Sequence, residues 1–201
     1  GKPRPPRQDM QAVAGGIGML RARTAARAAI LLGAVYGLLV LARVALVATA
    51  PADPGPYVDL FEQLAIACGA FAASELTRIG PALRVGFGVS ALSFAWAQVR
   101  YFAYTAGLVP AWIPPNQACW TILTTLAFAL AAVAVLAGRG TRLALRLTAL
   151  MVALFGLLVW VPRLAHDPAT GSNWGEISLN FLIAASALLI GERPAPARVR
   201  P

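Results

Sequence analysis

The sequence predicts an all-α, polytopic membrane protein: a helix bundle with six transmembrane helices. Its 201 residues are 59% hydrophobic and only 12% charged, whereas a soluble domain carries about 25% charged residues. Apolar runs recur along the whole chain, and about 20 such residues at 1.5 Å rise per residue cross a bilayer. We expect spans over residues 28–50, 59–77, 82–107, 117–137, 142–165 and 174–191.

The distribution of positive charge predicts the orientation of these spans. The net charge is +9, and all but three of the 17 Lys and Arg lie in four clusters. With six spans, every cluster falls on the same side, which the positive-inside rule assigns to the cytoplasm. Both termini are then cytoplasmic, and anionic lipid headgroups account for the excess charge without a nucleic-acid partner. The clusters are Lys2–Arg27, Arg78 with Arg84, Arg139–Arg146 and Arg193–Arg200.

An internal repeat relates the first helix pair to the last. YGLLV at 36–40 matches FGLLV at 155–159, and YVD at 57–59 matches WGE at 174–176. Both copies enter the membrane from the same side, so the repeat is parallel. The expected organisation is a basic cytoplasmic or interfacial segment (1–27), a first helix pair (28–81), a four-helix bundle (82–192) and a basic cytoplasmic tail (193–201).

Three arginines, Arg43, Arg100 and Arg163, lie outside the basic clusters, each in the outer part of an odd-numbered span. A charge at the centre of a span costs about 2.5–3.5 kcal/mol. In one interpretation each arginine reaches the headgroups or pairs with an acid of the next helix. In the other, the arginines form a polar layer with Glu176 and Asn180, which share a helix face at i and i+4. That layer would bind an anionic or quinone-like headgroup.

The only histidine, His166, lies beside Asp167 in the last outer loop. Its imidazole titrates near neutral pH, which suits a proton relay; the alternative is an ordinary surface residue. No partner His or Cys accompanies it, so we predict no metal site. Trp and Tyr crowd the outer half, either as an interfacial aromatic belt or as a stacking wall for a ring ligand.

Four segments, VPAWIPPNQACW, GRGTRLA, LMVALFGLLVWVPRLAHDP and NWGEISLNFLIAASALLI, resemble the DoxX-like family of bacterial inner-membrane proteins. The resemblance covers residues 82–191 directly. It implies a four-helix bundle in the bacterial inner membrane, here with a duplicated helix pair. It also implies links to sulfur-compound oxidation, quinone-coupled electron transfer or oxidative-stress complexes, often as a partner subunit. Among the aromatic residues, it marks Trp112 and Trp174.

We therefore expect an accessory subunit of a larger membrane complex of redox type. It would contact membrane lipids and other membrane-protein subunits, and bind a quinone or lipid in its outer half. The alternative is a quinone-linked oxidoreductase of small sulfur compounds, with Arg163, Glu176 and His166 as catalytic candidates. A transporter is disfavoured because no broken helix or midplane charge pair is evident. The candidate ligand-binding residues are Arg43, Arg100, Trp112, Arg163, Trp174, Glu176 and Asn180.

Overall fold

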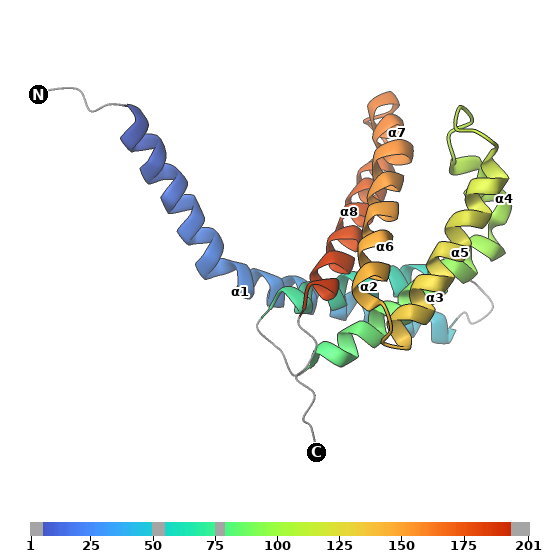
Figure 1. Ribbon diagram of the computed structural model, residues 1–201, viewed down its shortest axis with the longest axis horizontal. Helices are drawn as coiled ribbons and strands as arrows, with labels where there is room; N and C mark the ends of the chain where they lie inside the picture. The colour runs from blue at the N-terminus through green and yellow to red at the C-terminus, as the bar shows by residue number, and fades with distance from the viewer. Residues whose placement is uncertain (1–5, 50–54, 75–78, 194–201) are drawn as a thin grey trace, which may run out of the picture.

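The computed structural model describes residues 6–49, 55–74 and 79–193, with side chains from residue 25 onward. These parts of the chain are helical and contain no strand (Figure 1). In chain order the helices are α1 (Pro6–Thr49), α2 (Gly55–Ala73), α3 (Gly80–Arg100), α4 (Phe102–Leu108), α5 (Gln117–Leu136), α6 (Thr141–Phe155), a π-helical turn (Gly156–Trp160), α7 (Val161–His166) and α8 (Gly171–Gly191).

Within the described residues, five helical segments are long and apolar enough to cross a bilayer. Helix α2 is not among them, because its first half carries Asp59, Glu62 and Gln63. The five segments support the predicted membrane-embedded helical bundle. They are Ala25–Thr49, Gly80–Arg100, Gln117–Leu136, Thr141–His166 and Gly171–Gly191.

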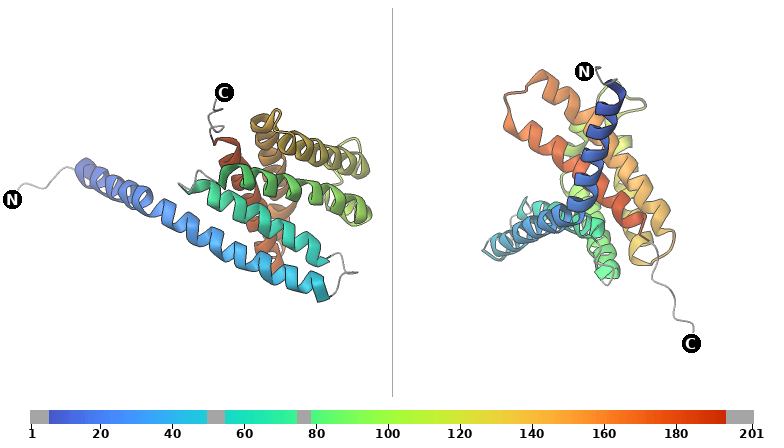
Figure 2. Two further views of the ribbon diagram at one scale, coloured as in Figure 1. Left: turned by 90° about the horizontal axis from the view of Figure 1, so that it is seen from below. Right: turned by 90° about the vertical axis from the view of Figure 1, so that its left-hand side faces the viewer.

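Five helices form a closed ring in the order α2, α3, α5, α6 and α8, with α8 returning to α2. Helix α1 lies outside this ring and packs along α2 (Figure 2). Because α3 and α8 touch only marginally, the last four helical segments do not close a bundle by themselves. Helix α2, expected to belong to a separate first pair, fills the position between α3 and α8.

The ring core contains small residues at the helix contacts and aromatic side chains toward α5. Phe128 of α5 meets Phe94 of α3 and Phe155 of α6 edge to face, with ring centroids 5.5 and 6.4 Å apart. On α2, the six consecutive residues 65–70 are all buried. This makes α2 the interior helix of the molecule, consistent with its tolerance of polar side chains that a lipid-facing helix would expose.

The two repeat copies meet where α2 crosses α8. A Cβ added to Gly69 would collide with the side chain and Cα of Ser186. These two positions are equivalent in the repeat, since residues 57–59 match residues 174–176 and the offset of 117 carries 69 to 186. Equivalent residues in contact indicate a local pseudo-two-fold relation between the hairpins. The small residues Gly69 and Ser186 allow the close approach that it requires.

Two predicted spans are interrupted. The expected helix over 82–107 is divided at Tyr101, which separates α3 from α4. The expected helix over 142–165 contains the π-helical turn, in which the Val161 N–H donates to the Gly156 carbonyl. Pro162 has no N–H to donate to the carbonyl four residues back, which favours an irregular turn at this point.

Helix ends also differ from the sequence prediction. Helix α1 runs without a break from Pro6, through residues expected to form a separate cytoplasmic or interfacial segment. Helix α2 begins at Gly55 and not at Asp59. Helix α8 begins at Gly171, three residues before the predicted position. Residues 50, 75–77 and the tail after 193 lie outside the described residues.

Candidate functional site

The molecule has two distinct ends. The loop end carries the connections 109–116 and 167–170, which Figure 1 shows on the same side of the molecule. The turn end carries the short connection 137–140 between α5 and α6, together with Glu192 after α8. Two features stand out between these ends: a cluster of charges near the loop end and an apolar groove between α5 and α6.

The charge cluster consists of Arg43, Asp59, Glu62, Arg163 and Glu176. Arg43 Nη1 lies 3.0 Å from Asp59 Oδ2, and the two side chains are 37% and 43% exposed. Glu62 interacts electrostatically with Arg43, Asp59 and Glu176. Glu176 in turn interacts with Asp59 and Arg163. The structure thus brings together charged residues of both repeat copies from the N-terminal halves of α2 and α8.

Within this cluster carboxylates outnumber guanidinium groups by three to two. Arg43 already has Asp59 as its partner, and Arg163 lies over the Trp160 ring, 5.2 Å from the ring centroid to Cζ. A buried acceptor, Gln63 Oε1, has no hydrogen-bond partner among the described residues. Both arginines of the cluster therefore already have partners, and the unpaired polar atom beside them is an acceptor, which disfavours an anionic ligand at this position.

Arg100 has a different environment. Its guanidinium lies 5.8 Å from the Tyr101 ring centroid, at the junction of α3 and α4. Among the described residues it forms no ion pair. A polar layer shared by all three lone arginines was expected. In the structure, Arg43 and Arg163 interact with the acids, whereas Arg100 has no such contact among the described residues.

Tryptophans tie the loops at the loop end to the helices that follow. The Trp174 indole N–H donates to the Pro168 carbonyl at 3.0 Å, and the Trp120 indole N–H donates to the Pro114 carbonyl at 2.8 Å. Both rings follow a proline by six residues, a spacing that could have identified Trp120 from sequence. Because the Trp174 N–H is already used, only its ring face is available to a ligand.

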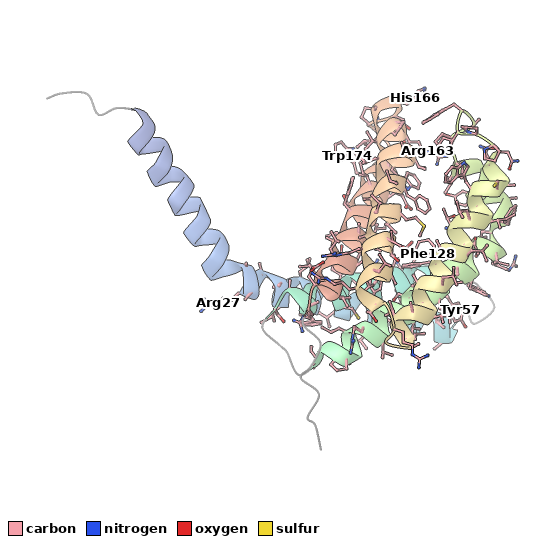
Figure 3. All side chains as sticks on the ribbon, viewed as in Figure 1. Arg27, Tyr57, Phe128, Arg163, His166 and Trp174 are labelled. Atoms are coloured by element: carbon pink, nitrogen blue, oxygen red, sulfur yellow. The ribbon has the colours of Figure 1, made fainter. Side chains whose placement is uncertain are left out.

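The other predicted site residues are dispersed. Trp112 is 74% exposed in the loop between α4 and α5. Asn180 donates from Nδ2 to the Glu176 carbonyl at 2.8 Å, within its own helix. His166 lies exposed at the end of α7 (Figure 3). No hydrogen bond or ion pair joins the three catalytic candidates in the described part of the chain, and no three potential metal ligands gather there.

An apolar groove of about 720 Å³ lies between α5 and α6. Figure 1 shows why: the α3–α4–α5 and α6–α7–α8 segments diverge toward the loop end. Three alanines of α5 on the lining, Ala127, Ala131 and Ala134, leave the space that larger side chains would fill. From Trp120 to Ala134 the groove follows α5 for about 21 Å at 1.5 Å per residue, more than half of a 30 Å hydrocarbon core.

The few polar atoms on this lining are already hydrogen-bonded. Thr124 Oγ1 donates to Gln98 Oε1 at 3.1 Å, and Thr148 Oγ1 donates to the Ala144 carbonyl at 2.9 Å. The Trp120 N–H is used by Pro114. A quinone ring or other polar headgroup placed within the groove would therefore leave its acceptors unpaired, which is costly. The lining fits a hydrocarbon chain.

The turn end is held by arginine side chains. Arg142 and Arg146 both donate to Glu192, with Arg146 Nε at 2.7 Å from Oε1. The hydrogen bond from Arg142, followed by that from Arg146, lowers the pKa of Glu192 to about 2. Arg193 donates to the carbonyls of Phe71, Ala72 and Ser74 at the end of α2. These contacts fix α6, α8 and α2 to one another.

Comparison with protein-family models, with curated proteins and with solved structures finds no match for the chain.

Proposed function

We propose that the protein is a non-catalytic accessory subunit of a bacterial inner-membrane complex, of DoxX-like type, that holds the hydrocarbon chain of a lipid or quinone in the α5–α6 groove. The groove is the observation that carries this proposal. It is about 720 Å³ in volume, which is within the usual range for small-molecule sites. Its lining has no uncommitted hydrogen-bond donor among the side chains named above.

The proposal includes six membrane crossings, with α2 as the sixth and both termini in the cytoplasm. In the first half of α2, Asp59 interacts with Glu176 of α8, and α2 crosses α8 at Gly69. Its polar first half faces protein partners such as Arg43, as expected for charged groups in a membrane. The arginines of the turn end then lie on the cytoplasmic side, in agreement with the positive-inside rule.

A role as a partner subunit is favoured by α1. Only 6% of the residues in its most apolar window are buried, against 28–39% in the other four spans. Leu31, Leu38 and Leu41 are each about two-thirds exposed. Helix α1 packs on α2, so most of its circumference is available to lipid or to another transmembrane helix.

The lack of hydrogen bonds among the catalytic candidates favours a subunit over the oxidoreductase alternative. His166 is exposed at the end of α7, and Arg163 is stacked on Trp160. A proton relay requires hydrogen-bond reach between its members, and these residues have no hydrogen bond to each other in the described structure.

The test is extraction and quantification of bound lipids and quinones from protein purified out of its native membrane. Ala127→Phe fills the groove, and Leu126→Phe places the same ring on the neighbouring residue, which does not line it. We expect wild type and Leu126→Phe to retain a chain-bearing molecule at about one per protein, and Ala127→Phe to lose most of it. Equal retention by all three, with equal melting temperatures, would exclude the groove as a binding site.

The same preparation distinguishes the enzyme alternative. Partner proteins that co-purify, with no quinone-dependent turnover of small sulfur compounds, are expected for an accessory subunit. Turnover that disappears in Arg163→Ala would instead establish the oxidoreductase.

A further inference from the structure

The groove lining cannot by itself select one lipid over another. In a bilayer the acyl chains of all lipids are as apolar as leucine, so moving a chain from lipid into the groove involves no hydrophobic driving force. Selection must come from polar or charged groups at the ends of the groove. The turn end offers such a group.

Arg139 is adjacent to the turn end of the groove. It lies beside Gly140, which lines the groove, and its backbone N–H donates to the carbonyl of another lining residue, Ala134, at 3.0 Å. Its side chain is exposed. A long cationic side chain beside the groove end has the reach to contact the headgroup of a lipid whose chain occupies the groove.

The neighbouring cations are already committed. Arg142 and Arg146 share the carboxylate of Glu192, and Arg193 is bound to carbonyls at the end of α2. Arg139 has no ion pair among the described residues. Among the described residues at this end of the molecule, these four arginines face one glutamate, and Arg139, which has no ion pair, is the one next to the groove.

We propose, on the basis of the proposed lipid-chain groove, that its occupant is a phospholipid of net negative charge whose phosphate pairs with Arg139. The guanidinium fork is suited to bidentate hydrogen bonds with phosphate oxygens. A zwitterionic phospholipid offers the same phosphate but adds an ammonium group near the arginine, which reduces the attraction. The expected preference is about fivefold, the fold-change that corresponds to about 1 kcal/mol per basic residue at an anionic surface.

The experiment titrates the delipidated full chain in detergent with phosphatidylglycerol or phosphatidylethanolamine of identical acyl chains, and counts bound lipids by native mass spectrometry. Arg139→Gln removes the proposed partner. Arg27→Gln removes the same charge from an exposed position on α1, far from the groove (Figure 3). Ala127→Phe blocks the groove itself.

We expect wild type and Arg27→Gln to prefer phosphatidylglycerol about fivefold, Arg139→Gln to bind the two lipids equally, and Ala127→Phe to bind neither at this site. If Arg139→Gln keeps the preference, or wild type shows none, the headgroup assignment is wrong while the groove remains a chain-binding site. If Ala127→Phe binds both lipids as wild type does, the proposed function fails as well.

Discussion

The first hairpin, α1–α2, and the last, α6–α7–α8, are copies of one sequence design in different surroundings. Helices α2 and α8 occupy equivalent places and cross at the equivalent residues Gly69 and Ser186. The helices that precede them in each hairpin differ in burial. In the most apolar window of α1, 6% of the residues are buried, against 28% in the segment Thr141–His166. That segment also contacts α5, whereas α1 packs on α2. The repeat therefore specifies the hairpin, and the neighbouring helices determine which of its surfaces are exposed.

The lone arginine of each hairpin shows the same difference. Arg43 forms an ion pair with Asp59 on the facing helix. Its counterpart Arg163 stacks on Trp160 of its own helical segment, and its interaction with Glu176 is electrostatic at longer range. At this position the first hairpin therefore has a cross-helix ion pair, whereas the arginine of the last hairpin contacts a ring of its own helical segment.

The largest effect is expected at the crossing of the two copies. Gly69→Ala would place a methyl group against the side chain and backbone of Ser186, and should destabilise the fold by about 3 kcal/mol or more. Gly37→Ala, in α1 of the same hairpin, meets nothing within 4 Å and should gain up to about 1 kcal/mol of helix propensity. Thermal unfolding in detergent measures both. Similar melting temperatures for the two variants would contradict the close crossing.

An intermediate effect is expected from Arg43→Ala. It leaves Asp59 beside Glu62 without its cation, and the pair is only partly exposed, so we expect a loss of about 1–2 kcal/mol. Arg163→Ala removes a cation–π contact and should cost about 0.5–1 kcal/mol. The same unfolding assay compares them. Adding Asp59→Asn should restore part of the Arg43→Ala loss, and an additive double variant would argue against the ion pair.

The smallest effect is expected for Glu192→Gln in the last hairpin, and it concerns the stability of the fold at acidic pH. The pKa of Glu192 is lowered to about 2 from its usual 4.5, so the unfolded chain binds a proton at a higher pH than the folded chain does. The stabilisation by the ion pairs of Glu192 with Arg142 and Arg146 is therefore complete above pH 4.5 and is lost as the pH falls toward 2. Melting temperatures between pH 6 and 3 should fall more steeply for wild type than for Glu192→Gln. Parallel curves would mean that the ion pairs of Glu192 contribute nothing to the stability of the fold.

Much of the helical layout could be predicted from the sequence, because apolar runs and turn residues are local signals. Helix α5 begins at Gln117 as expected, where the Asn116 side chain accepts from the Cys119 N–H. The Arg43–Asp59 pair follows from the hairpin spacing. The start of α2 was not predicted correctly: the helix begins at Gly55, four residues before the expected start at Asp59.

The groove could not be predicted, because it depends on how two helix pairs diverge. Ala127 and Ala134 are as compatible with close helix packing as with an open lining, and only the arrangement of α5 against α6 decides between them. The position of Arg139 beside the groove could not be predicted either, because it also depends on the arrangement of α5 against α6. In the sequence it is one of several clustered arginines, and only the contacts of Arg142, Arg146 and Arg193 distinguish it.

The π-helical turn has a consequence for the relation between the two copies. FGLLV lies 119 positions after YGLLV, but Arg163 lies 120 positions after Arg43, so the last copy contains one extra residue between these points. The wide turn over Gly156–Trp160 is located where that residue must be accommodated. In a regular α-helix the insertion would rotate everything beyond it by about 100°. The bulge absorbs the added length instead, so Arg163, like Arg43, still interacts electrostatically with an acid of the neighbouring helix.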